Sequence, residues 1–235
     1  MKYLTLLFLF IPTTTFSQYD ILSERERASL KDELMADRFN NLLPELMDRT
    51  GIDMWVLIAR EYNEDPVLRT MLPAKWLNAR RRTILVFYRD AEKGTIDKLA
   101  VARYDVGENI KSAWDKEQEP DQWKALVRLI KERNPKKIGI NTSEYFGIAD
   151  GLVNTDYEAL LEALPAEEEA KLVSAEKLAI AWIETRTEKE MELYNTLVQI
   201  THDIIAEAFS TKVITAGETT TDDVVWWMRQ KVTDL

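Results

Sequence analysis

The chain has 235 residues, of which 46% are hydrophobic and 31% are charged. This balance is typical of a folded globular protein and excludes a disordered chain, a collagen and a multi-span membrane protein. The formal net charge of −10 disfavours binding to the phosphate backbone of nucleic acids. Because the sequence contains no cysteine, disulfides, thiolate zinc sites, iron–sulfur clusters and cysteine nucleophiles are excluded. The single histidine, His202, excludes a multi-histidine metal site within this chain.

Residues 1–17 have the pattern of a secretory signal peptide. Lys2 precedes an apolar run from Leu4 to Ile11, and the small residues Thr15 and Ser17 follow it. The run is shorter than the ~20 apolar residues that a membrane-spanning helix needs. We therefore expect cleavage next to Gln18 and export of the mature protein to the periplasm or the exterior. The alternative is a buried N-terminal strand or helix.

A long helix is expected to begin after Ser23. Ser23 and Glu26 have the spacing of a capping box, in which each side chain accepts a hydrogen bond from the backbone of the other residue. The apolar face of this helix consists of Met35, Phe39, Leu42, Leu43 and Leu46. Pro44 lacks an N–H group and is expected to kink the helix or to begin a second one, and Gly51 is expected to end it.

The next part of the chain alternates apolar runs with helical patterns. A helix is expected after Pro120-Asp121, while the polar segments Arg60–Pro73 and Gly107–Pro120 are expected to be connections. Strands are expected over residues 54–59, 83–88, 99–104, 137–140 and 171–173, with helices over 157–164 and after 173. This order of elements predicts an α/β domain with a mixed sheet over roughly residues 20–180.

The remainder of the chain is expected to be helical. Thr187 and Glu190 form a second capping box before an amphipathic helix that Gly217 breaks, and Asp222 and Asp223 begin another helix. The apolar run Val224–Met228 should be buried on all sides, yet residues 187–235 offer two helices and no sheet to cover it. We therefore expect a truncated chain or a missing partner. The alternative is that the last helix folds back onto the α/β domain.

Three segments carry a resemblance to a known family. Residues 51–66, the helix opening at 186–193 and the turn at 216–223 are similar to the creatinase/aminopeptidase P-like metallopeptidases, although Ala216 stands where proline is usual in that family. The resemblance implies a creatinase-like N-terminal α/β domain with an RNase-H-like fold over residues 18–180. Residues 181–235 would then begin an incomplete α+β "pita-bread" metallopeptidase domain.

The same resemblance implies a function. The chain would be the N-terminal portion of an exported Xaa-Pro aminopeptidase- or prolidase-like hydrolase, and its partners would be proline-containing peptides and further copies of itself, with no nucleic acid and no membrane after signal cleavage. Two divalent metal ions, such as Mn or Zn, would be held by Asp, Asp, His, Glu and Glu beyond this chain, so no residue here is expected to bind metal or to be catalytic. The alternative is a non-catalytic module that binds peptides or proteins or mediates oligomerisation.

One cluster of residues is a candidate for substrate contact. Arg80, Arg81 and Arg82 can form paired hydrogen bonds with a carboxylate, and Trp76 can stack on a proline ring. In related enzymes the first domain of a neighbouring subunit borders the substrate cleft, which implies that this loop reaches the cleft of a partner subunit. The alternative is a solvated loop whose arginine stems cover apolar surface.

Other polar groups have structural explanations. His202 is expected to lie on a helix face at a domain contact, and Asp222 and Asp223 are expected to cap a helix rather than bind metal. Glu167–Glu169 is expected to be a solvated loop. The sequence contains no Gly-x-Gly, Gly-x-Ser-x-Gly or His-Glu-x-x-His motif.

Overall fold

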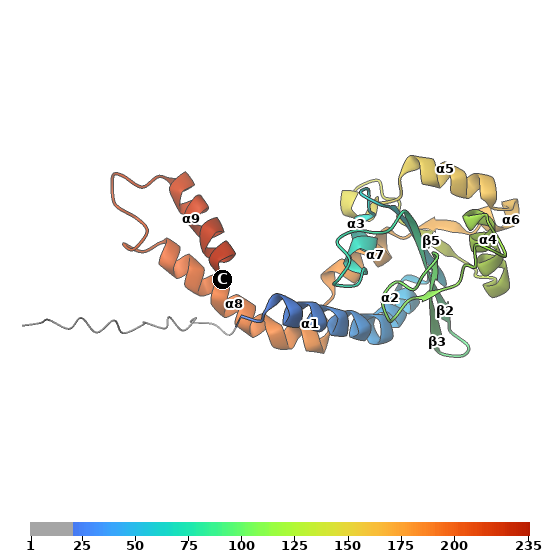
Figure 1. The fold of residues 1–235 in the computed structure, drawn as a ribbon, viewed down its shortest axis with the longest axis horizontal. Coiled ribbons are helices and arrows are strands. Elements are labelled where there is room, and N and C mark those ends of the chain that lie inside the picture. Colours follow the sequence, from blue (N-terminus) through green and yellow to red (C-terminus); the bar gives the residue numbers. More distant parts are fainter. Residues whose placement is uncertain (1–20) are drawn as a thin grey trace, which may run out of the picture. The chain divides into compact units, whose positions relative to one another are not determined.

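The structure, a computed structural model, describes residues 21–235, and its chain divides into two units (Figure 1). Residues 25–193 form an α/β unit, and Tyr194–Leu235 belong to a second, helical unit. The signal peptide predicted over residues 1–17 lies outside the described residues. Within the described part of the chain, no helix is long and apolar enough to cross a membrane.

The α/β unit is built on a six-stranded mixed sheet, which confirms the predicted fold class at this level. The strand order is β4 (Lys111–Ser112), β3 (Thr95–Val101), β2 (Arg82–Asp90), β1 (Met54–Arg60), β5 (Ile138–Ile140) and β6 (Leu172–Ser174). The neighbouring strands β1–β2 and β2–β3 are antiparallel, whereas β3–β4, β1–β5 and β5–β6 are parallel.

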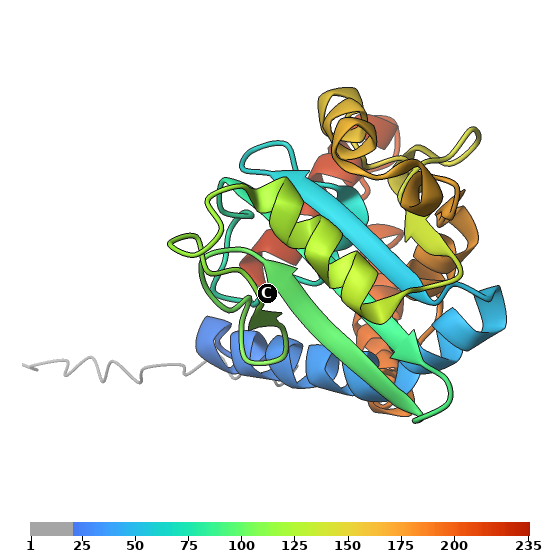
Figure 2. The same cartoon turned by 90° about the vertical axis from the view of Figure 1, so that its right-hand side faces the viewer.

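Strand β1 lies within the sheet and is buried on both faces. Trp55 and Leu57 face a core that is shared with α2 (Leu43–Thr50), α3 (Pro66–Thr70) and α7 (Glu176–Glu184). Val56 and Ile58 face a second core, formed with α4 (Gln122–Arg133) and α5 (Asn154–Ala163). Figure 1 shows α2, α3 and α7 on one side of the sheet, and Figure 2 shows α4 lying across the other. A strand between two helical layers needs a continuous apolar run, and this explains why residues 54–59 have no polar alternation.

The first helical segment contains a π-turn that accommodates Pro44. Helix α1 (Glu24–Asp37) continues into the π-helical turn η1 (Arg38–Leu42) and then into α2, which has Pro44 in its first turn. The N–H of Leu43 donates to the carbonyl of Arg38, five residues back. Proline cannot donate a hydrogen bond, and its ring clashes with the carbonyl four residues back, so the wider turn lets the chain pass Pro44 without a break. Gly51 ends α2 with a φ of +65°, as predicted.

Two predicted connections contain regular structure. The segment 60–73 was expected to be a loop, but residues 66–70 form α3 because the side chain of Asp65 accepts hydrogen bonds from the N–H groups of Val67 (2.8 Å) and Leu68 (2.9 Å). Pro66 therefore begins a helix instead of breaking one. The predicted connection 107–120 contains the two residues of β4, which pair with β3.

Other boundaries differ from the expected ones. Strand β3 lies earlier than the predicted 99–104, because the hairpin after β2 already pairs Asp90 with Thr95. Glu167–Glu169 was expected to be a solvated loop, but it lies in the short helix α6 (Ala166–Glu169). Glu168 is buried there and forms an ion pair with Lys171 at 2.9 Å. The segment between β5 and α5 also contains a 3₁₀ turn, η2 (Gly147–Ala149).

The helical unit consists of the C-terminal part of α8 (Glu188–Ala208) and of α9 (Thr221–Asp234). The predicted start of α9 is confirmed, because Thr220 and Asp223 form a reciprocal capping box. Lys231 in α9 forms an ion pair with Glu207 in α8 at 3.0 Å. Val224 alone in the apolar run of α9 is buried, and Trp226 is 59% exposed. The missing partner or truncation expected from this run stays a prediction.

Gly151 is required by close packing rather than by its backbone conformation. A Cβ atom built at this position would lie 2.3 Å from Oδ2 of the buried Asp65. We expect Gly151→Ala to lower the free energy of unfolding by about 1–3 kcal/mol, because the carboxylate and its hydrogen bonds must shift. Urea unfolding would measure this loss. Gly147→Ala is the control, since a Cβ there has no neighbour within 4 Å, and equal effects of the two substitutions would contradict this explanation.

Candidate functional site

Trp76 and Arg80, both predicted as site residues, lie together with Tyr104. The Arg80 guanidinium carbon is 5.0 Å from the centroid of the Trp76 ring and 5.5 Å from that of Tyr104. The two rings meet edge-to-face, with their centroids 5.8 Å apart. We call Trp76, Arg80 and Tyr104 the aromatic–arginine cluster. Tyr104 was not predicted as a site residue, because its position beside the loop 71–81 follows from the strand pairing of β2 with β3.

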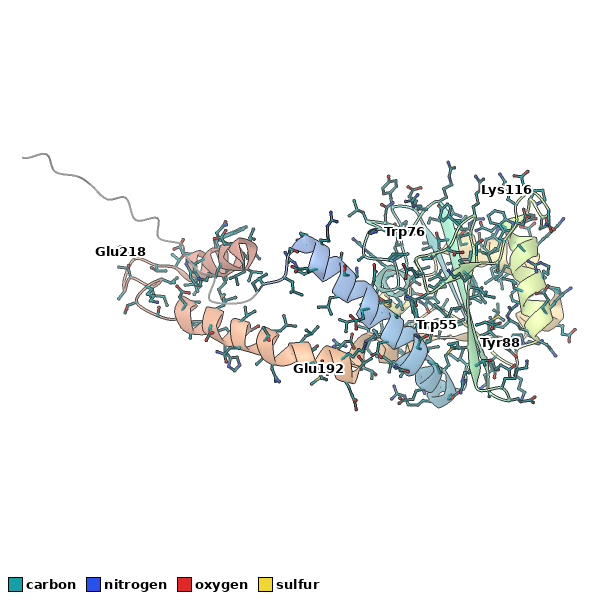
Figure 3. The ribbon with its side chains drawn as sticks, turned by 60° about the horizontal axis from the view of Figure 1, so that its bottom comes forward. Trp55, Trp76, Tyr88, Lys116, Glu192 and Glu218 are labelled. Atoms are coloured by element: carbon teal, nitrogen blue, oxygen red, sulfur yellow. The ribbon has the colours of Figure 1, made fainter. Side chains whose placement is uncertain are left out.

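The cluster borders an open hollow of about 560 Å³. Among the described residues, the guanidinium of Arg80 donates no hydrogen bond to protein, so its N–H groups remain available to a ligand. Trp76 is half-buried, and the neighbouring Leu77 is 88% exposed. Figure 3 shows Trp76 at the edge of the α/β unit, in contrast to Trp55 in its interior. The hollow thus combines a cation with aromatic and aliphatic surface, which suits a ligand that carries both a carboxylate and an apolar ring.

The three consecutive arginines do not form one group. Arg81 has a φ of +51°, and its backbone is held by Glu61: the Arg81 N–H donates to Oε2 (3.1 Å), and the Glu61 N–H donates to the Arg81 carbonyl (2.6 Å). The side chain of Arg81 is exposed beside the hollow. Arg82 forms an ion pair with Asp156 and lies 4.8 Å from the centroid of the Trp123 ring. The structure therefore places Arg80 and Arg81 with Trp76 and separates Arg82 from them.

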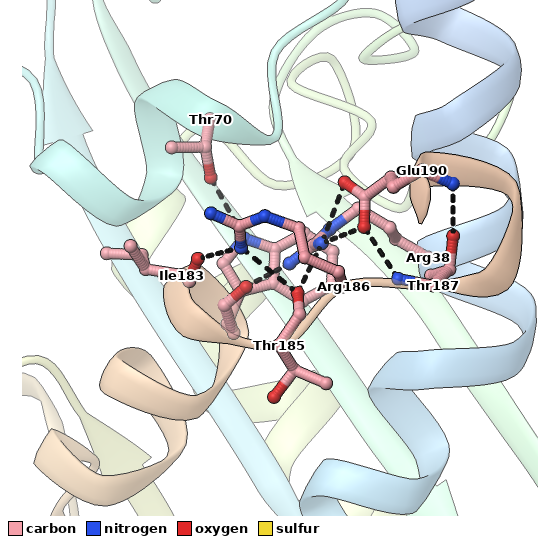
Figure 4. A network of polar contacts seen from close by, with 8 residues as sticks. Arg38, Thr70, Ile183, Thr185, Arg186, Thr187 and Glu190 are labelled. Atoms are coloured by element: carbon pink, nitrogen blue, oxygen red, sulfur yellow. Dashed lines mark hydrogen bonds and ion pairs between the residues drawn. The ribbon is translucent and has the colours of Figure 1, made fainter. Parts of the chain in front are cut away.

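A buried arginine holds the segment between α7 and α8 (Figure 4). Nη1 of Arg38 donates to Glu190 Oε2 (2.8 Å) and Oε1 (3.0 Å) and to the Thr185 carbonyl (2.9 Å). Its Nη2 donates to the carbonyl of Trp182, and the guanidinium stacks on the Trp182 ring, 4.4 Å from the centroid. Burial lowers the pKa of Arg38, while the neighbouring Glu190 carboxylate opposes that shift. These contacts join the π-turn to the start of α8.

Glu190 has two structural roles. As predicted, it forms a capping box with Thr187: its Oε2 accepts from the Thr187 N–H (2.8 Å), and its own N–H donates to Thr187 Oγ1 (3.3 Å). The same carboxylate neutralises Arg38. The capping motif is visible in the sequence, whereas the ion pair joins residues 152 positions apart and has no local sequence signal.

A second buried network connects three elements of the α/β unit. The Trp55 indole N–H donates to Oδ1 of Asn141 (2.8 Å), and Nδ2 of Asn141 donates to Oδ2 of Asp65 (2.8 Å). Burial raises the pKa of the Asp65 carboxyl above its ordinary value, and the hydrogen bonds from Leu68, Asn141 and Val67 oppose that shift. Every polar atom of this network is satisfied by a neighbour, so the network serves to fix α3 against β1 and the end of β5.

The remaining candidate residues have no partners that indicate chemistry. His202 is exposed on α8, and its predicted domain contact stays a prediction. Asp223 caps α9, as expected. Within residues 21–235, no group of three or more histidine, aspartate or glutamate side chains is placed to hold a metal ion.

The chain is similar to a Xaa-Pro dipeptidase from Bacillus anthracis, with 17% sequence identity and a TM-score of 0.46 over 87% of this chain and 49% of that chain. The chain thus spans about half the length of this solved relative. No protein-family model and no curated protein matches the chain. The similarity assigns no role to any residue described above.

Loss of the Glu190 carboxylate should destabilise the α/β unit. We expect Glu190→Gln to lower the free energy of unfolding by about 2 kcal/mol, because Arg38 would remain buried with its charge uncompensated. Urea unfolding followed by tryptophan fluorescence would detect this loss. Glu188→Gln is the control, because Glu188 is exposed in the same turn of α8. A loss of similar size in both variants would contradict a specific role for the ion pair.

The raised pKa of Asp65 has a definite consequence for stability against pH. A carboxyl with a raised pKa in the folded state contributes stability below the unfolded-state value, near 3.8, and this contribution is lost as the pH rises through the folded-state value. Relative to Asp65→Asn, the wild type should therefore lose stability as the pH rises above about 4.

The control is a carboxyl whose pKa is lowered, so its contribution to stability should change with pH in the opposite direction. The Ser112 N–H and Lys111 bind Asp105 and lower the pKa of its carboxyl. The wild type should gain stability relative to Asp105→Asn as the pH rises through the lowered pKa of the Asp105 carboxyl. Urea unfolding of the three proteins, from pH values below the lowered pKa of Asp105 up to neutral pH, would test both statements. Parallel curves for wild type and Asp65→Asn would contradict the first.

Proposed function

We propose that this chain is part of an exported Xaa-Pro aminopeptidase- or prolidase-like metallopeptidase, in which the α/β unit positions proline-containing peptides and mediates self-association. The resemblance of residues 51–66, 186–193 and 216–223 to this family supports the proposal. In its terms, residues 18–180 are the creatinase-like N-terminal domain, and residues 181–235 begin the metallopeptidase domain. The residues described here do not form a site for the two metal ions of that family, so their ligands would have to come from outside residues 21–235.

The observation that carries the proposal is the aromatic–arginine cluster. Arg80 is held over two rings and keeps N–H groups available, so it can donate paired hydrogen bonds to the terminal carboxylate of a short peptide. The Trp76 ring and the exposed Leu77 provide apolar surface for a pyrrolidine ring. These groups bind and orient a peptide, and the cluster contains no nucleophile or base for the hydrolysis itself.

Peptide hydrolysis by the protein expressed from its complete gene would test this function. With Mn²⁺ present, we expect cleavage of Xaa-Pro peptides, and we expect Trp76→Ala and Arg80→Gln to raise KM by about tenfold with little change in kcat, because uniform binding is lost. Arg89→Gln is the control, since Arg89 pairs with Asp48 at the other end of β2.

Two results would contradict the proposal in different ways. Unchanged KM values for Trp76→Ala and Arg80→Gln in an active enzyme would remove the cluster from substrate binding. Absence of cleavage together with retained peptide binding, measured by calorimetry, would favour the non-catalytic binding module.

A further inference from the structure

A second pair of arginines lies on the opposite side of the sheet from the aromatic–arginine cluster. Arg60 ends β1, Arg82 begins β2, and the two are direct partners in the strand register. Both reach the fully buried carboxylate of Asp156 in α5. Nε and Nη2 of Arg60 donate to Oδ2 and Oδ1, each at 2.8 Å, and Nε of Arg82 lies 3.1 Å from Oδ1. We call Arg60 and Arg82 the guanidinium pair.

The charges of this group do not balance. Like charges at paired positions of neighbouring strands repel each other, and the single carboxylate of Asp156 compensates one of the two cations. Within the described part of the chain, Asp156 is the one acidic residue that forms an ion pair with Arg60 or Arg82. The nearby Glu61 and Glu64 instead accept hydrogen bonds from backbone N–H groups, those of Arg81 and Ala79 among them. The group therefore carries one uncompensated positive charge.

Arg82 is held in place on several sides. Its guanidinium carbon lies 4.8 Å from the centroid of the Trp123 ring, and Asp156 holds its Nε. Its backbone carbonyl accepts from the side-chain amide of Gln122 (3.1 Å), which also donates to the carbonyl of Val101 (2.6 Å). An arginine fixed by stacking and by a buried acid has little side-chain entropy left to lose when it binds a ligand.

The side chains of both arginines are partly exposed. The side chains of Arg60 and Arg82 are 39% and 29% exposed, respectively. Among the described residues, the two terminal nitrogens of Arg82 donate no hydrogen bond. Its buried Nε is close enough to Asp156 for an ion pair, but the two atoms are not aligned for a hydrogen bond. Asp156 occupies one edge of the Arg60 guanidinium and leaves the terminal Nη1 without a protein partner. The pair thus leaves N–H groups of both guanidiniums without a partner among the described residues, beside the half-buried Trp123.

We propose that the guanidinium pair and Trp123 bind a carboxylate, supplied by a small organic acid or by the C-terminus of a peptide. A monoanion matches the single uncompensated charge, and the planar fork of N–H groups on a guanidinium suits the two oxygens of a carboxylate. Trp123 packs against the core formed with α4, whereas Trp76 packs against the core formed with α2 and α7. The two candidate sites are therefore separate, and this inference does not depend on the proposed peptidase function.

Fluorine NMR of the protein labelled with 5-fluorotryptophan would test the proposal. Trp123→Phe identifies the Trp123 resonance, and titrations use sodium acetate, the peptide Gly-Gly-Ala and the same peptide with an amidated C-terminus, with sodium chloride as the ionic-strength control. We expect a saturable shift of the Trp123 resonance with Gly-Gly-Ala and none with its amide or with chloride. We expect Arg82→Gln to weaken binding at least tenfold and Arg89→Gln to leave it unchanged.

The three titrants distinguish the two possible sources of the carboxylate, a small organic acid and a peptide C-terminus. Equal binding of acetate and Gly-Gly-Ala would show that the carboxylate alone is recognised, and binding of the peptide alone would identify a peptide C-terminus as the ligand. The proposal is overturned if no carboxylate gives a saturable shift, or if the amidated peptide binds as well as the acid. Arg60→Gln is a second variant in case Arg82→Gln unfolds, and the acid–amide comparison on the wild type needs no variant.

Discussion

Strand β1 has no solvent face, and this constraint decides where the polar groups around it can go. Its apolar side chains fill both cores. Charged or polar groups at its carboxyl end must therefore pair with one another or lie at the edge of the sheet. Asn141 accepts a hydrogen bond from the Trp55 indole and donates one to Asp65. Asp156 forms an ion pair with Arg60. These two carboxylates come from the N-cap of α3 and from α5. The contacts of one strand therefore fix the positions of elements on both sides of the sheet.

The sequence was sufficient to predict the features whose causes are local. The apolar run at 54–59, the cap at Gly51 and the helix start at Asp121 depend on neighbouring residues, and each is observed. Helix α3 lies in a segment that its prolines predict to be a loop, because Asp65 caps the helix and Pro66 stands at its first position. Strand β3 was placed too late because its pairing with β2, rather than its own composition, sets where it starts.

The candidate site was predictable only where its residues are close together in the sequence. Trp76 and Arg80 are close in sequence and lie together, whereas Tyr104 joins them through the sheet. The run Arg80–Arg82 looked like one cationic group, but a strand begins at Arg82, and successive side chains of a strand point to opposite faces. The ion pairs of Arg38 with Glu190 and of Arg82 with Asp156 were not predictable, because each joins residues that are brought together by tertiary packing alone.

The π-turn at Arg38 also limits how the sequence can vary. Pro44 favours the wider turn, the turn carries Arg38, and Arg38 serves three acceptors that belong to α7, to the segment after it and to α8. A lysine at position 38 would offer a single nitrogen for acceptors that two guanidinium nitrogens now serve, and a neutral residue at position 190 would leave the arginine uncompensated. Positions 38, 44 and 190 are therefore linked through one turn and one side chain, although 146 positions of the chain separate the proline from the glutamate.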